Sequence, residues 1–252
     1  MKPSLEITVA VPCPEKCSFC PQQVLALAYK GDLVMKLETL KRCLKTVPSN
    51  CRVDFTGFCE PLVHTDFGAM LQYVKSQGHS IHLFTTLIGL NHAKLDQIKK
   101  VAPEHICIHC PDEVGFFVDD DKWILLHTIW LRARIPATYM AMGRLTPKVK
   151  EHLDYMCIHV ERPTMLCRGG SLWKINHLQG EIRCAADRWH NNVLLPNGDV
   201  QICCMDFGLT MCCGNLLRQP YSEIEKTANE FAANHNPPDN CICRSCEWCT
   251  TK

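Results

Sequence analysis

Three cysteines near the start of the chain could hold a metal centre. Cys13, Cys17 and Cys20 are spaced C-x3-C-x2-C and directly follow LEITVAV (5–11), an apolar, β-branched run that predicts a strand. A closed zinc site needs four protein ligands, and no fourth cysteine lies nearby. Three thiolates on a four-iron cluster leave one iron open to an outside ligand. A zinc site completed by a distant residue is the alternative interpretation.

A second set of cysteines lies toward the other end of the chain. Cys184 and Cys203 follow the order C-x13-G-x4-C, and Cys243 and Cys246 form a C-x2-C pair. Four thiolates suit either an iron–sulfur cluster or a zinc ribbon. Two other ligand assignments remain open, because Cys204 could replace Cys203 and Cys249 could join Cys246.

The composition limits the class of protein. The chain has 252 residues, 19 of them cysteine, with 46% apolar and 21% charged residues and a net charge of +1. Such a chain can bury a core, and its charge gives no general attraction to nucleic acid or to a membrane. No apolar run reaches the roughly 20 residues of a membrane-spanning helix. Because the start of the chain is not typical of a secretory signal, we expect a cytoplasmic protein whose thiols stay reduced.

The elements that must position these cysteines alternate along the first 165 residues. Strands are predicted at 5–11, 53–55, 81–86, 105–109, 137–142 and 155–160, separated by helical stripes such as 37–47, 67–74, 95–102, 123–131 and 146–153. Six such repeats predict an α/β fold with a parallel sheet, and an eight-unit barrel needs about 250 residues. We therefore expect a partial (β/α)6 barrel in 1–165, with its chemistry at the carboxyl ends of the strands. Residues 166–252 form a small cysteine-rich domain that includes a hairpin at LPNGDV (195–200).

The first cysteine segment, PCPEKCSFCP (12–21), resembles the cluster loop of the radical S-adenosylmethionine (SAM) enzymes. The resemblance implies a [4Fe–4S] cluster on the three cysteines, with SAM on the open iron as the source of a 5′-deoxyadenosyl radical. Phe19 matches the aromatic residue that packs near adenine. In FTGFCEP (55–61), Gly57 and Glu60 match the Gly-Gly-Glu segment that meets the SAM amino group, although Phe58–Cys59 replaces the second glycine. Thr85, at the end of the third strand, is a further candidate for the same pocket.

The C-terminal pattern resembles the SPASM/twitch extension of these enzymes. The resemblance implies that Cys184, Cys203, Cys243 and Cys246 hold an auxiliary [4Fe–4S] cluster. Since only Cys249 follows the C-x2-C pair, the shorter twitch form with one cluster is favoured.

An auxiliary cluster with four protein ligands favours electron transfer, and the layout resembles the radical SAM dehydrogenases of aminocyclitol synthesis. That resemblance implies oxidation of a carbinol to a ketone in a sugar- or cyclitol-like small molecule, with a reductant such as flavodoxin or ferredoxin. Arg168 is the candidate catalytic residue, although a guanidinium is a poor base; His109 and His64 are other candidate bases. The alternatives are a peptide maturase, an epimerase, an iron–sulfur electron carrier and a zinc-binding module.

Overall fold

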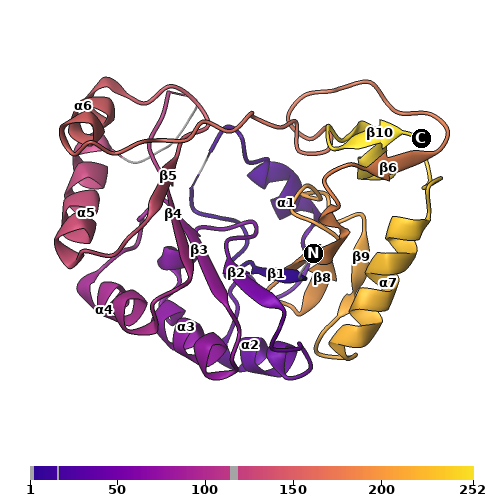
Figure 1. Ribbon diagram of the computed structural model, residues 1–252. Coiled ribbons are helices and arrows are strands. Elements are labelled where there is room, and N and C mark those ends of the chain that lie inside the picture. Colours follow the sequence, from indigo (N-terminus) through magenta and orange to yellow (C-terminus); the bar gives the residue numbers. More distant parts are fainter. Residues whose placement is uncertain (1–2, 16, 114–118) are drawn as a thin grey trace.

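A computed structural model describes residues 3–15, 17–113 and 119–252 (Figure 1). The strands are β1 (Ser4–Ile7), β2 (Arg52–Phe55), β3 (Ile81–Thr85), β4 (His105–His109), β5 (Thr138–Met140), β6 (Ile182–Cys184), β7 (Asn191–Leu194), β8 (Asp199–Gln201), β9 (Cys212–Asn215) and β10 (Cys249–Thr251). The helices are α1 (Gln22–Ala28), α2 (Leu37–Leu44), α3 (Phe67–Ser76), α4 (His92–Val101), α5 (Asp120–Ala133), α6 (Pro147–Tyr155) and α7 (Tyr221–Ala233), with short 3-10 turns η1 (Pro61–Val63), η2 (Arg188–His190) and η3 (Ile242–Ser245).

One sheet of eight strands organises the molecule, in the order β5-β4-β3-β2-β1-β7-β8-β9. The strands from β5 to β7 are parallel, and β7, β8 and β9 then form an antiparallel meander. The curved parallel part carries helices α2 to α6 along its outer face (Figure 1). This α/β architecture, with a parallel sheet and a cysteine-rich C-terminal region, confirms the expected fold class.

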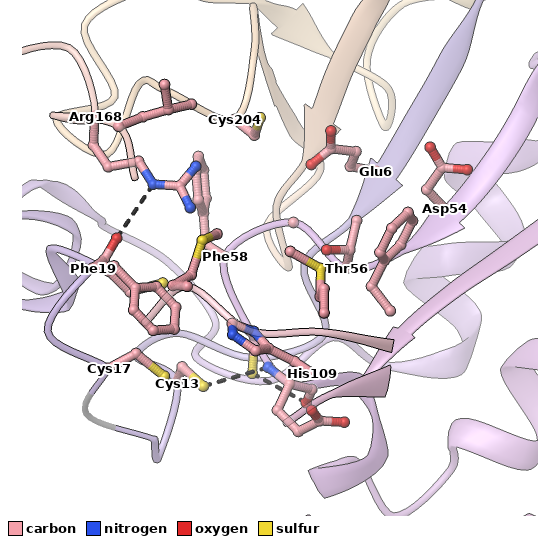
Figure 2. A pocket seen from close by; sticks show the side chains of 18 of the residues that line it. Glu6, Cys13, Cys17, Phe19, Asp54, Thr56, Phe58, His109, Arg168 and Cys204 are labelled. Atoms are coloured by element: carbon pink, nitrogen blue, oxygen red, sulfur yellow. Dashed lines mark hydrogen bonds between the residues drawn. The ribbon is translucent and has the colours of Figure 1, made fainter. Parts of the chain in front are cut away.

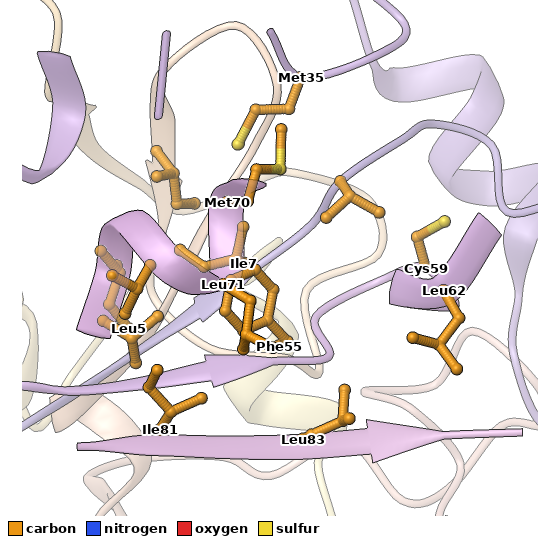
Figure 3. Close-up of a cluster of buried hydrophobic side chains, with 14 of the residues drawn as sticks. Leu5, Ile7, Met35, Phe55, Cys59, Leu62, Met70, Leu71, Ile81 and Leu83 are labelled. Atoms are coloured by element: carbon orange, nitrogen blue, oxygen red, sulfur yellow. The ribbon is translucent and has the colours of Figure 1, made fainter. Parts of the chain in front are cut away.

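The core lies between the parallel strands and this helical layer (Figure 3). Leu5 and Ile7 of β1 and Phe55 of β2 are fully buried, as are Met70 and Leu71 of α3. Each such side chain contributes about 1.5–3 kcal/mol when it leaves water. Because side chains alternate along a strand, residues between the apolar positions of β1 and β2 face the interior of the partial barrel. The strands thus separate a dry outer face from an inner face available for a site.

The sixth predicted strand, at 155–160, is wrong. Helix α6 continues to Tyr155, and the segment beyond it joins the sheet only through a parallel bridge between Met140 and Glu161. Its alternating pattern does not lead to burial, since Tyr155 is 83% exposed. The first strand is also shorter than predicted, because after Thr8 the chain turns to pair with residues 33–35.

The C-terminal region continues the main sheet. The predicted turn at 195–200 does join β7 to β8, and Gly198 has the positive φ of +89° that this turn requires. Strand β7 pairs in parallel with β1, while β6 and β10 form a separate two-stranded sheet. A boundary at 165/166 therefore stays a prediction. Among the described residues, no helix is both long and apolar enough to cross a membrane.

Candidate active site

The loop that carries the first three cysteines connects β1 to α1 and is fixed by side chains of its neighbours. Gln22 accepts a hydrogen bond from the Cys13 backbone N–H (3.0 Å) and donates one to the Phe58 carbonyl (2.8 Å). The Glu60 backbone N–H donates to Cys13 Sγ at 3.3 Å. The cysteine loop and the loop after β2 are thus held together, as the predicted joint role of the two segments requires.

The surroundings of these thiols favour thiolates at two of the three positions. Hydrogen bonds from the Cys59 thiol and the Glu60 backbone N–H lower the pKa of Cys13. A hydrogen bond from Cys17, aided by the positive charge of Arg168, lowers the pKa of Cys20. Thiolates are the form that binds iron, so the loop suits metal ligation.

The aromatic residue of the loop is held from two sides. Phe19 is 4% exposed and stacks on His109, at the end of β4, with ring centroids 5.0 Å apart. Arg168 Nε donates a hydrogen bond to the Phe19 carbonyl at 3.3 Å. The imidazole is nearly enclosed, and burial lowers the pKa of His109 to about 4, so the ring is neutral at pH 7.

The sequence predicts that Glu60 contacts the SAM amino group. In the structure its carboxylate is already hydrogen-bonded within the chain. Its carboxylate accepts hydrogen bonds from Leu62 N (2.9 Å), Thr85 Oγ1 (2.7 Å), Thr86 N (2.6 Å) and Thr86 Oγ1 (2.7 Å). Each carboxylate oxygen already has two donors, which match its two lone pairs. Glu60 therefore ties the loop after β2 to the end of β3, and Thr85 is one of its partners.

Gly57 allows this loop to approach β1. Its φ is +60°, and a Cβ there would lie 2.4 Å from Thr8 Oγ1. That hydroxyl accepts a hydrogen bond from the Phe58 backbone N–H at 3.1 Å. The glycine is thus needed for the backbone geometry, whatever it contacts in a bound cofactor.

A cavity of about 440 Å³ lies at the carboxyl ends of the parallel strands. Figure 2 shows Cys13, Cys17, Phe19 and His109 on one side of it and Glu6, Asp54 and Cys204 on the other, with Arg168 above. The structure brings together the predicted residues of the first site, which all line this cavity: Cys13, Cys17, Phe19, Cys20, Gly57, Glu60, Thr85 and Arg168.

His64 is not part of this arrangement. Its Nδ1 accepts a hydrogen bond from Asp66 N at 3.0 Å, so Nε2 carries the proton that it donates to the Met35 carbonyl at 2.8 Å. His64 is outside the lining of the cavity and fixes the turn before α3 instead.

The second set of predicted ligands converges in the C-terminal region. Cys184 and Cys249 are cross-strand partners in β6 and β10, and their thiols are hydrogen-bonded. Cys249 also contacts Cys243 and Cys246, and the buried Cys203 lies close enough to both of these for charge interaction. The structure thus places the four predicted cysteines together and adds Cys249, which the sequence left as an alternative.

Two buried charged side chains hold the loops that carry these cysteines. The Arg244 guanidinium donates to the carbonyls of Leu178 and Gly180, both at 3.0 Å, and to Asn236 Oδ1 at 2.7 Å. The Asp206 carboxylate accepts from the backbone N–H groups of Thr210 and Met211 at 3.0 and 2.7 Å. The C-x2-C segment and the loop after β8 are therefore both held by hydrogen bonds within the chain.

The donor sets fit iron–sulfur clusters. Among the described residues, no three Cys, His, Asp or Glu side chains are arranged as ligands of one metal ion. A cluster takes a separate thiolate on each iron, so its ligands need not converge on one metal ion. Cys13, Cys17 and Cys20 are the residues that would hold one cluster, and the C-terminal cysteines are those that would hold a second.

Sequence reasoning missed Glu6, which lies on β1 and lines the cavity. It is 7% exposed, and burial raises its pKa to about 7, with the Asp54 charge adding to the shift. The available signal was a carboxylate between Leu5 and Ile7, followed by Thr8, so that polar residues alternate with apolar ones along a strand.

The C-terminal cysteines lie in a segment that matches a known family model. A family model described as an iron-sulfur cluster-binding domain, SPASM, matches residues 184–247, which begin at Cys184 and end just after Cys246. Residues 184–247 are therefore similar to a SPASM domain. A comparison with curated proteins gave no match.

Solved structures with this fold include three that carry bound molecules. One is BtrN in complex with AdoMet and 2-DOIA (TM-score 0.68, 16% identity, 98% of this chain and 93% of that chain). A second is anSMEcpe with bound AdoMet (0.68, 14%, 97% and 86%), and a third is SuiB of Streptococcus suis bound to precursor peptide SuiA (0.67, 12%, 98% and 70%). The expected resemblance to radical SAM proteins with a SPASM/twitch extension is thereby confirmed at the level of the fold.

Proposed function

We propose that the protein is a radical SAM enzyme that oxidises a carbinol of a sugar- or cyclitol-like small molecule to a ketone. The observation that carries this proposal is the cavity itself. Three thiols of the cluster loop face it from one side, and a loop of the SPASM domain closes it from the other. AdoMet is bound in the similar structures of BtrN and anSMEcpe, which supports the same cofactor here.

The chain's own residues then have distinct tasks. Cys13, Cys17 and Cys20 would hold the first cluster, whose chemistry would be the one-electron reductive cleavage of SAM. Phe19 covers this end of the cavity and excludes water, while Arg168 fixes the loop through the Phe19 carbonyl. Arg168 also lines the cavity, where its positive charge can bind a carboxylate of SAM or of a substrate.

A second cluster would be held by the auxiliary cysteines Cys184, Cys203, Cys243 and Cys246. Cys249 is a fifth thiol beside them, and this cluster would supply a one-electron acceptor. Cys203 is followed directly by Cys204, which lines the cavity. A one-electron acceptor held there would lie just behind the cavity wall. This placement supports oxidation over a reaction that returns the hydrogen atom to the substrate.

The first test is anaerobic reconstitution. The protein should hold about eight irons, four per cluster, and should convert SAM to 5′-deoxyadenosine when reduced. The Cys17→Ala variant should lose this cleavage, whereas Cys243→Ala should retain uncoupled cleavage and lose the oxidised product. Bound zinc with no iron absorbance would refute the proposal, and iron without SAM cleavage would indicate an electron carrier.

A peptide substrate is the competing candidate, because SuiB bound to its precursor peptide has a similar fold. Carbon-deuterated hexoses and cyclitols, and deuterated peptides, can be compared under identical conditions. The true substrate class transfers deuterium into 5′-deoxyadenosine. Transfer from a peptide alone would refute the small-molecule proposal, and return of solvent hydrogen with inverted configuration would indicate an epimerase.

A further inference from the structure

Several carboxylates line the cavity, and they differ in how many hydrogen-bond or ion-pair partners they already have. Glu6, Glu15, Asp54 and Glu60 are the carboxylates among its described lining residues. Arg52 binds Asp54 in a bidentate pair, with Nε–Oδ1 and Nη2–Oδ2 distances of 2.6 and 2.7 Å. Glu60 already accepts four hydrogen bonds, and Glu15 belongs to the cysteine loop. Glu6 is therefore the carboxylate best placed to exchange a proton with a bound substrate.

Glu6 lies where β1 is flanked by both neighbouring strands. Its register partners are Asp54 in β2 and Val193 in β7. The positive charges of Arg168 and Arg188, which also line the cavity, act on Glu6, and the Cys204 thiol is hydrogen-bonded to it. Arg52 acts on it from β2 as a further positive charge.

Together these groups hold the pKa of the Glu6 carboxyl near 7. Burial is the largest influence on its pKa and Asp54 adds to it, whereas Arg188, Arg168 and Cys204 act in the opposite direction, leaving the pKa at about 7. A base with a pKa near the working pH takes up a proton and releases it again in each turnover.

The contact with Cys204 connects Glu6 to the auxiliary site. Cys203, the neighbouring residue, lies near Cys243 and Cys246. Glu6 and Cys204 are both on the side of the cavity away from Cys13 and Cys17 (Figure 2). A proton and an electron can therefore leave a substrate toward the same wall.

Resting on the proposed function, we propose that Glu6 is the catalytic base of the oxidation. After hydrogen abstraction the substrate carbon carries one unpaired electron and a hydroxyl group. The hydroxyl O–H bond breaks, its proton forms the O–H bond of the Glu6 carboxylic acid, and the C–O bond becomes C=O. One electron leaves the carbon for the one-electron acceptor held by the auxiliary cysteines. Glu6 replaces Arg168 in this role, since a guanidinium stays protonated.

A titration of the reconstituted protein tests Glu6 without turnover. Infrared difference spectra between pH 5 and pH 9 should show a protonated carboxyl band with a midpoint near 7. The band should be absent in Glu6→Gln and retained in the control Glu151→Gln, whose side chain is exposed on α6. A midpoint below about 5 would overturn the proposal, because so weak a base would stay ionised throughout the reaction.

Turnover with carbon-deuterated myo-inositol, glucose and UDP-glucose gives a second readout. With a probe that transfers deuterium, Glu6→Gln should still form deuterated 5′-deoxyadenosine, while ketone formation should fall by about 100-fold or more. Wild-type ketone formation should rise with pH through about 7, and Glu6→Asp should recover part of the rate. Equal ketone formation in Glu6→Gln, or a raised KM with unchanged kcat, would overturn the role of Glu6 as base. Failure of the wild type to cleave SAM would instead defeat the proposed function itself, and the base proposal with it.

Discussion

At the scale of single residues, Glu60 is a structural link as well as a candidate cofactor contact. Glu60→Gln would place an amide N–H₂ group against donors from Thr85 or Thr86, because the carboxylate receives only hydrogen-bond donors. We expect unfolding free energy to fall by about 1–3 kcal/mol in urea denaturation, since buried donors would lose their acceptor. The exposed control Glu151→Gln should stay within about 0.5 kcal/mol of wild type. A loss confined to SAM affinity would show that the link contributes no stability.

Glu6 should make the stability of the protein depend on pH. Its pKa is about 7 in the folded state against an ordinary 4.5, so the native state binds the extra proton between these values. Stability is therefore expected to decrease as pH rises from about 4.5 to 7 and then to level off. Glu6→Gln removes this dependence, and its stability relative to wild type should increase by up to about 3 kcal/mol between pH 4.5 and pH 8. Urea denaturation at these two pH values measures the difference; an unchanged difference would contradict the assignment.

The residues of the site differ in how far the sequence could reveal them. Cysteine spacing is local, so Cys13, Cys17 and Cys20 could be predicted as ligands without the fold. Glu6 could not be assigned to the cavity, because an isolated carboxylate in a strand shows neither its neighbours nor its burial. The Glu60 carboxylate accepts hydrogen bonds from Thr85 and Thr86, which belong to another strand and the loop after it. The sequence around Glu60 does not reveal these partners.

At the scale of elements, the turn after β2 determines how closely that loop approaches β1. Gly57→Ala would put a Cβ about 2.4 Å from Thr8 Oγ1 and force a side chain into the left-handed region. We expect a loss of about 1–3 kcal/mol in unfolding free energy and displacement of the loop that holds Glu60. Gly78→Ala is a useful control, since its φ is +82° but its nearest neighbour would be 3.8 Å away. Equal losses in both variants would show that backbone strain alone, without the clash, sets the cost.

The elements themselves were largely predictable from periodicity. The apolar stripes at 37–47, 67–74 and 123–131 correspond to α2, α3 and α5, and the first five strands were identified with shifted ends. The strand predicted at 155–160 is wrong because an alternating pattern indicates a strand only when one face of it becomes buried. Tyr155 is the last residue of α6 and lies in solvent, which the local pattern does not reveal.

At the scale of the whole molecule, the two ends of the chain share one sheet. The parallel pairing of β1 with β7 joins residues more than 180 positions apart, from Ser4↔Asn191 to Ile7↔Leu194. No periodicity within either segment encodes this pairing, so the sequence predicted two consecutive domains. The link also brings the segment after β8 to the cavity, since Cys204, the neighbour of Cys203, lines it.

This shared sheet predicts that loss of the auxiliary site affects the entire molecule. A Cys243→Ala/Cys246→Ala variant should hold about four irons in place of about eight, because it removes two thiols of one site only. Since β7 pairs directly with β1, the variant should unfold in one transition at a lower temperature. Hydrogen exchange should show the same loss of protection in β4, at the far side of the sheet, as in β8. If β4 kept its protection while β8 lost it, the two regions would be independent units, and the continuous sheet would carry no cooperativity between the cavity and its auxiliary site.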